Sequence, residues 1–195
     1  ITWDRPLLKA SVRLPGGRRL HVVNLHLRSP LAALVPGQKE DSFTWRNTHA
    51  WAEGFFMATV KRAGQALETR MTVDRLFDAE PEALIAVCGD FNAEERETPL
   101  RTIRADVEDT GNGRLAGRVL IPMDRTVPET QRFSVIHQGH KVMLDHILVS
   151  RRLLEFYRHV EIHNEALGDE AVAYSGVRHS PESYHAPVVA EFELA

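Results

Sequence analysis

The chain has 195 residues, 43% of them hydrophobic, and is long enough to bury the core of one domain. Its 24 Lys and Arg against 27 Asp and Glu give a net charge of −3, which excludes an overall basic surface but not a local positive groove. A single cysteine excludes an intramolecular disulfide framework, and no apolar run has the length of a bilayer. We therefore expect a soluble protein without a membrane span; its compartment stays open, with the cytoplasm favoured.

The first predicted element is a β-hairpin with strands over 7–12 and 20–27, joined by a turn that contains Pro15-Gly16-Gly17. In its second strand Asn24 and His26 share one face, because side chains alternate along a strand. That face is either a solvated strand surface or the rim of an active site, and the pattern allows both.

Proline and glycine residues predict a loop over 28–43, and long loops in compact domains often carry function. Arg28 and Lys39 lie in this loop. They suit contact with an anionic substrate, and they suit plain solvated surface charge as well.

A helix is predicted over 44–77, with Asp41 or Ser42 as its N-cap. Its first half contains the aromatic residues Trp51 and Phe55, which we expect to face the core.

The most informative stretch is the strand and turn at residues 84–93, Leu-Ile-Ala-Val-Cys-Gly-Asp-Phe-Asn-Ala. The apolar run predicts a strand buried on both faces, with Cys88 as a small buried side chain rather than a nucleophile. Asp90 and Asn92 follow where the strand ends, and in extended chain they point to the same side. A carboxylate beside an amide suits a cation, a phosphate or a water to be deprotonated. A turn in which both side chains cap the backbone is the alternative.

The second half of the chain is predicted to hold a hairpin over 132–137 and 141–150, a short helix over 153–158 and a final strand over 188–194. Asp145 lies on an otherwise apolar strand face and requires a partner there, because burying an unpaired carboxylate is costly. His185 stands just before the final strand.

Four short motifs carry a family resemblance. They are Asn24-Leu25-His26-Leu27, Gly89-Asp90-Phe91-Asn92-Ala93, Leu144-Asp145-His146-Ile147-Leu148-Val149-Ser150 and Ser183-Tyr184-His185-Ala186-Pro187-Val188-Val189. In this order they resemble the endonuclease/exonuclease/phosphatase superfamily, whose fold is the deoxyribonuclease-I-like fold. The resemblance spans nearly the whole chain. It implies a four-layer α/β sandwich and divalent-metal-dependent hydrolysis of a phosphoester.

The resemblance also implies roles for single residues. His26 would contact the phosphate or serve the leaving group, and Asp90 would orient or deprotonate the attacking water. Asn92 would bind phosphate or metal, so that Asp90 and Asn92 are the expected ligands of Mg²⁺ or Mn²⁺. Asp145 would pair with His185, and His185 would stabilise the pentacovalent state at phosphorus.

Two further residues are expected at the substrate and one departs from the family pattern. Asn24 and Arg28 are the candidate substrate-binding residues. The position before His185 is usually acidic, but here it is Tyr184, and a tyrosine does not replace a carboxylate as a magnesium ligand at neutral pH. We therefore expect a weakened metal site.

Domains of this family also carry an earlier half, with an amide ligand and a metal-binding glutamate. Residues 1–195 are accordingly expected to form a single, partial domain whose N-terminal half is missing. Such a partial sandwich would expose an apolar face, so the chain is expected to form a homodimer or to depend on the missing segment. Alone, it is expected to lack full activity.

Two functions compete on these observations. The first is a metal-dependent phosphoesterase, a nuclease-like or phosphodiesterase hydrolase; the alternative is a non-catalytic remnant of the same fold that acts as a binding module. The substrate stays open among nucleic acid, phospholipid and small phosphate esters, since a fold does not choose between them.

Overall fold

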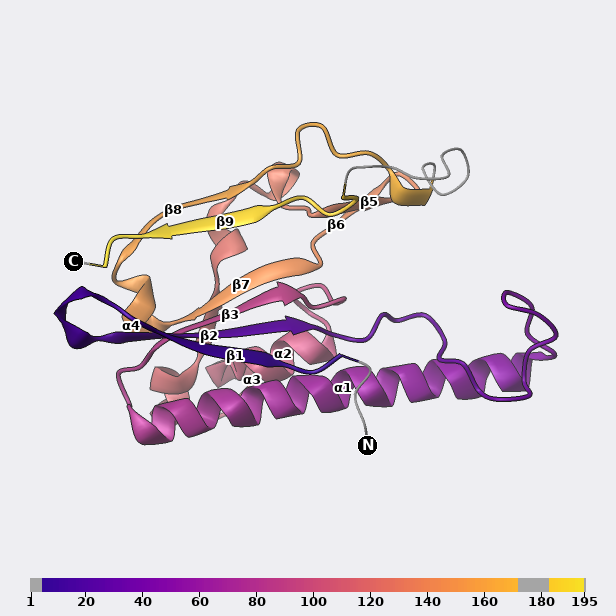
Figure 1. Ribbon diagram of the computed structural model, residues 1–195, viewed down its shortest axis with the longest axis horizontal. Coiled ribbons are helices and arrows are strands. Elements are labelled where there is room, and N and C mark those ends of the chain that lie inside the picture. The colour runs from indigo at the N-terminus through magenta and orange to yellow at the C-terminus, as the bar shows by residue number, and fades with distance from the viewer. Residues whose placement is uncertain (1–4, 172–182, 195) are drawn as a thin grey trace.

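A five-stranded mixed sheet lies at the centre of the computed structural model, which describes residues 5–171 and 183–194 (Figure 1). Its order is β1-β2-β3-β7-β4, and β3 runs parallel to β2 while all other neighbours are antiparallel. The strands are β1 (Leu8–Arg13), β2 (Arg19–His26), β3 (Leu84–Asp90), β4 (Leu120–Pro122) and β7 (Asp145–Ser150). The predicted hairpin of β1 and β2 is confirmed.

Helices cover one face of this sheet. The long α1 (Thr48–Ala79) and α2 (Thr98–Arg104) pack against it, and the short α3 (Val107–Thr110) follows α2. The buried side chains between the two layers include Val23, Leu25, Ile85, Val87 and Leu148 from the sheet and Ala66, Val73, Phe77, Leu100 and Ile103 from the helices.

A second, two-stranded sheet covers the opposite face. It consists of β8 (Tyr157–Ile162) and β9 (Val188–Phe192), and α4 (Arg151–Leu154) connects β7 to it. Leu84 and Val149 of the central sheet share a core with Val160 and Ile162 of β8. The predicted α/β sandwich is confirmed, and the described residues build three layers of it: helices, central sheet and second sheet. None of the described helices is long and apolar enough to cross a membrane.

The strand β3 is covered on both faces, as its apolar run predicts. Ile85 and Val87 face the helices, whereas Leu84 faces the second sheet. Apart from Ala86, which is partly exposed, the part of β3 open to solvent is its end, where the Gly-Asp-Phe-Asn-Ala motif begins.

The predicted start of the long helix is wrong by four residues. Helix α1 begins at Thr48, and Asn47 caps it by accepting a hydrogen bond from the Ala50 backbone N–H at 2.8 Å. Asp41 instead caps a turn, since its Oδ1 accepts from the N–H groups of Phe43 and Thr44. Both residues have good N-cap side chains, and the chain path of the loop decides between them.

The expectation that Trp51 and Phe55 face the core is also wrong. Their exposed fractions are 47% and 44%. The first half of α1 extends beyond the ends of the sheet strands (Figure 1), so no layer lies there to bury them. Only Ala50, Gly54 and Ala58 are buried in this half of the helix.

Two predictions in the second half of the chain need correction. The hairpin holds only β5 (Val135–His137) and β6 (His140–Val142), because β7 leaves it and enters the central sheet between β3 and β4. The helix predicted over 153–158 ends at Leu154, and β8 follows. In β8 the alternating Val160 and Ile162 are buried against the central sheet, which favours a strand over a helix.

Candidate active site

Three polar side chains form one row across the sheet edge. In the strand register His26 of β2 lies beside Asp90 of β3, and Asp90 lies beside Asp145 of β7. Cross-strand neighbours point to the same face, so the parallel pairing of β2 with β3 and the antiparallel pairing of β3 with β7 bring these groups together. His26 Nε2 lies 3.1 Å from Asp90 Oδ2.

Asn92 joins the row through a turn rather than through an extended strand. Its φ of 46° is left-handed, and this bend lets the Asn92 N–H donate to Asp90 Oδ1 at 2.8 Å. The side-chain Nδ2 donates to Asp90 Oδ2 at 3.1 Å and to the Leu27 carbonyl at 3.0 Å. With its nitrogen held by two acceptors, the amide has its oxygen to offer to a ligand. The predicted backbone-capping turn is therefore present, and it leaves the Asn92 side-chain oxygen available to a ligand.

Gly89 makes the close approach of β3 to β2 possible. Its φ is +130°, and a Cβ built there would lie 2.0 Å from the Leu25 carbonyl oxygen. Only a residue without a side chain fits beside β2 at this point.

His185 supplies the partner that Asp145 requires. Its Nδ1 lies 2.8 Å from Asp145 Oδ2, although the two residues are far apart in the chain. Buried Ser134 holds both segments in place: its Oγ accepts from the Asp145 N–H at 3.1 Å, and its carbonyl accepts from the Ala186 N–H at 2.8 Å. The arrangement fixes the imidazole beside the row.

Burial and neighbouring charges shift the pKa values of the groups in the row. Burial raises the pKa of Asp90; the Asn92 N–H opposes this shift, and the Asp145 carboxylate adds to it. The hydrogen bond that His185 Nδ1 donates to Asp145 raises the pKa of His185 despite its partial burial. Burial lowers the pKa of His26, with Arg5 and His185 acting in the same direction and Asp90 opposing them. The pKa values of the two histidines that flank Asp90 and Asp145 are thus shifted in opposite directions.

The donor set fits a divalent cation. One ligand atom each of Asp90, Asp145 and His185 can be chosen so that all lie within 4.8 Å of one another. Carboxylate oxygens are the ligands that magnesium uses, commonly only one or two together with water and substrate phosphate. Asp145 is an addition to the predicted ligands Asp90 and Asn92.

Asn24, Arg28 and Tyr184 are the other residues singled out in the sequence. Asn24 is exposed on the same face as His26, and its Nδ2 approaches Cys88 Sγ at 3.8 Å. Burial raises the pKa of the Cys88 thiol, which argues against a nucleophile. The Arg28 N–H donates to Gln65 Oε1 of α1 at 2.8 Å. Tyr184 is partly buried beside His185 in the chain.

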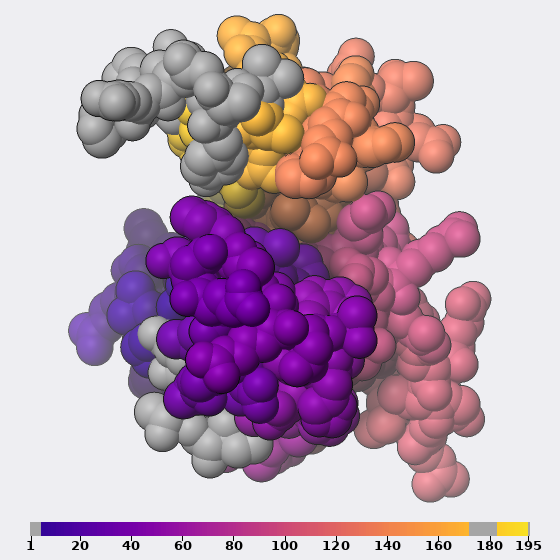
Figure 2. All heavy atoms as spheres, turned by 90° about the vertical axis from the view of Figure 1, so that its right-hand side faces the viewer, coloured from indigo at the N-terminus to yellow at the C-terminus, as the bar shows by residue number. Residues whose placement is uncertain are grey.

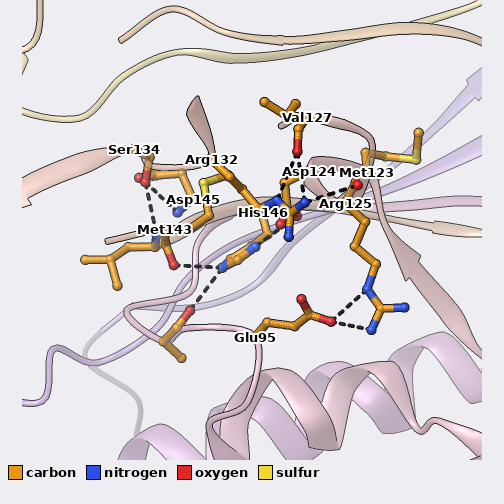
Figure 3. A network of polar contacts seen from close by, with 12 residues as sticks. Glu95, Met123, Asp124, Arg125, Val127, Arg132, Ser134, Met143, Asp145 and His146 are labelled. Atoms are coloured by element: carbon orange, nitrogen blue, oxygen red, sulfur yellow. Dashed lines mark hydrogen bonds and ion pairs between the residues drawn. The ribbon is translucent and has the colours of Figure 1, made fainter. Parts of the chain in front are cut away.

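His146 is a positioning residue that the sequence patterns did not single out. The buried ring lies 3.2 Å from Asp124 Oδ1 through Nδ1, while Nε2 is 3.0 Å from the Ala93 carbonyl and 3.1 Å from the Met143 carbonyl (Figure 3). Both ring nitrogens face oxygen atoms, and an imidazole protonated on both nitrogens, hence positively charged, satisfies all three contacts. Burial opposes this charge, yet Asp124 and the carbonyls raise the pKa of His146. One imidazolium thus ties the segment after Asn92 to the segment before Asp145.

Arg62 is a second residue that sequence reasoning missed. From α1 its Nη1 donates to the Asn92 carbonyl at 2.6 Å, and its Nη2 lies 3.6 Å from Glu97. Nothing in the helix sequence distinguishes this arginine from a surface one; only its place opposite the end of β3 does so.

Solved structures of similar fold agree with the arrangement of strands and helices. A 3′ phosphatase, NExo, from Neisseria bound to a product DNA hairpin aligns over 95% of this chain with a TM-score of 0.51 and 15% identity. An endonuclease/exonuclease/phosphatase from Bacteroides vulgatus aligns over 100% with 0.53 and 19%, and an AP endonuclease from Archaeoglobus fulgidus over 98% with 0.53 and 14%. No family model and no curated protein sequence matches the chain.

These likenesses confirm the deoxyribonuclease-I-like fold of the endonuclease/exonuclease/phosphatase proteins. The chain spans 65%, 59% and 71% of the lengths of the three neighbours. At such identities the likeness concerns the fold, so the chemistry must be argued from the side chains.

Proposed function

We propose that this chain carries the catalytic constellation of a divalent-metal-dependent phosphoesterase. The single observation that supports this most is the row of His26, Asp90 and Asp145 at one sheet edge, with His185 bonded to Asp145. The neighbours named above include a phosphatase and an endonuclease of the same fold, in agreement with this class of reaction.

In the proposed reaction Asp90 orients the attacking water and accepts its proton. The Asn92 N–H donates to Asp90 Oδ1 and holds the carboxylate in this orientation. His185, whose pKa is raised by its hydrogen bond to Asp145, stabilises negative charge that develops on the phosphate oxygens. His26 contacts the phosphate or the leaving group.

A cation held by Asp90, Asn92 Oδ1 and Asp145 would neutralise charge on the phosphate oxygens. Mg²⁺ or Mn²⁺ is the proposed ion, because the three donors are hard oxygen atoms. Tyr184 adds no carboxylate to this set, so the weakened affinity expected from the sequence remains part of the proposal.

The test is hydrolysis of a small phosphodiester, bis(p-nitrophenyl) phosphate, and of an oligonucleotide in Mg²⁺ or Mn²⁺. We expect Asp90→Asn to lower kcat by a factor of about 10² to 10⁴. The matched control is Asp109→Asn, at an acidic residue of α3 that pairs with Arg101 away from the row.

The non-catalytic binding module remains the second candidate, favoured by Tyr184 and by the share of the neighbours that the chain spans. Binding of an oligonucleotide in calorimetry without hydrolysis of either substrate would support it. Equal activity of Asp90→Asn and the wild-type chain would contradict the phosphoesterase proposal.

A further inference from the structure

An exposed aromatic pair lies on the part of α1 that extends past the sheet. The rings of Trp51 and Phe55 stack with centroids 5.4 Å apart and planes inclined by 23°. About half of each side chain is exposed. Figure 2 views the molecule from this end, where the start of α1 and the loop before it (purple) face the viewer. Within the described residues the outer side of the pair faces solvent.

The pair lies on the same face of α1 as Arg62, which contacts the candidate active site. Residues four and eleven positions apart lie on one face of an α-helix, so Trp51, Phe55 and Arg62 are aligned. Arg62 in turn bonds the carbonyl of Asn92. At a rise of about 1.5 Å per residue, the pair lies about 10 to 17 Å along the helix from Arg62. The stacked rings therefore lie one or a few nucleotide lengths from the site.

The alignment of the candidate active site, Arg62 and the aromatic pair fits an unpaired strand of nucleic acid. Arg62 marks the position of the site along the helix, and its own guanidinium contacts the Asn92 carbonyl and Glu97. A nucleic-acid chain with a phosphate in the site would reach the exposed aromatic faces one or a few nucleotides further on. Bases stack on aromatic side chains regardless of sequence, since every base has a π-face. A small phosphate ester is too short to reach the pair.

We propose that Trp51 and Phe55 form a stacking platform for bases of a single-stranded nucleic acid whose phosphate occupies the candidate active site. The proposal rests on the proposed phosphoesterase function and narrows its substrate class to nucleic acid. It also gives a reason for two large aromatic side chains to stay exposed beside the site.

The test is binding of a fluorescent single-stranded oligonucleotide of about eight nucleotides, followed by anisotropy with the full chain. Trp51→Ala and Phe55→Ala should each raise the Kd by about 5- to 100-fold, while Trp51→Phe keeps most of the affinity. The matched control is Met71→Ala, because Met71 is equally exposed, at 47%, on the second half of the same helix.

Hydrolysis of bis(p-nitrophenyl) phosphate separates this proposal from the proposed function. If the wild-type chain hydrolyses the small ester but both alanine variants bind the oligonucleotide as tightly as the wild type, the platform is wrong and the phosphoesterase stands. If the small ester is not hydrolysed while the variants still lose oligonucleotide affinity, the platform stands and the phosphoesterase fails.

Vesicles of phosphatidylglycerol and phosphatidylcholine test the other class of macromolecule. Loss of vesicle binding in Trp51→Ala with unchanged oligonucleotide binding would overturn the platform in favour of a lipid surface. Unchanged vesicle binding together with weakened oligonucleotide binding supports the platform.

Discussion

At the residue scale, the bond between His185 and Asp145 shows how a distant carboxylate sets the charge of a candidate catalytic group. Asp145 Oδ2 lies 2.8 Å from His185 Nδ1 and holds the imidazole in one orientation. An imidazole held in this way carries its proton to higher pH than a free one, which suits a group that must meet phosphate oxygens.

Removing this carboxylate should therefore lower the pKa of His185. In the wild-type chain the pKa lies above the ordinary histidine value, chiefly through the hydrogen bond to Asp145; in Asp145→Asn burial lowers it, opposed by the smaller influence of Asp90 and Glu170. The measurement is an NMR titration of the His185 ring, assigned with His185→Gln. Asp109→Asn on α3 is the control and should leave the titration of His185 unchanged. An unchanged pKa in Asp145→Asn would show that another group holds the charge.

At the scale of elements, the end of β3 depends on its contact with β2. The Leu27 N–H donates to the Asp90 carbonyl at 2.9 Å, and the Phe91 N–H donates to the Leu144 carbonyl at 2.8 Å. These bonds continue the two strand pairings past Gly89 into the motif. The position of Asp90 in the row thus depends on how closely the strands approach one another.

Gly89→Ala should disrupt this approach. The added methyl group would meet the Leu25 carbonyl, and the φ of +130° adds backbone strain. We therefore expect the free energy of unfolding to fall by about 1–3 kcal/mol or more. Urea denaturation measures it. Gly139→Ala is the matched control, because Gly139 also has a positive φ, of +79°, but nothing within 4 Å of its Cβ position. Equal losses in both variants would mean that the strand contact contributes nothing beyond the glycine dihedral.

At the scale of the whole molecule, exposed apolar side chains gather in the loop before α1. Leu31, Leu34 and Phe43 are 74%, 72% and 91% exposed. The second sheet, by contrast, presents mostly polar side chains outward, such as His159 and Glu161 of β8. We expect this loop to be the surface through which the self-association predicted from the sequence takes place.

Sedimentation velocity at rising protein concentration tests this expectation. The wild-type chain should form faster-sedimenting species, and the triple variant Leu31→Ser, Leu34→Ser and Phe43→Ser should shift toward the monomer, because it removes the apolar contact area. Leu8→Ser on the exposed edge strand β1 is the control. A wild-type chain that stays monomeric throughout would contradict the prediction.

The sequence by itself determined the local features of this protein. The period of two in residues 20–27, the apolar run that ends at Gly89-Asp90 and the unpartnered carboxylate of Asp145 each indicate a strand or a polar strand end, because these properties depend on near neighbours in the chain. The order of four short motifs then indicated the fold, which the structure and its neighbours confirm.

Only the tertiary structure decided which of these residues meet. The register that aligns His26, Asp90 and Asp145, the entry of β7 into the central sheet and the supporting contacts of Ser134, His146 and Arg62 join segments far apart in the chain. The exposure of Trp51 and Phe55 depends on how far α1 extends past the sheet, which no helical period encodes. Periodicity describes one element, whereas burial and side-chain pairing depend on what the rest of the chain places beside it.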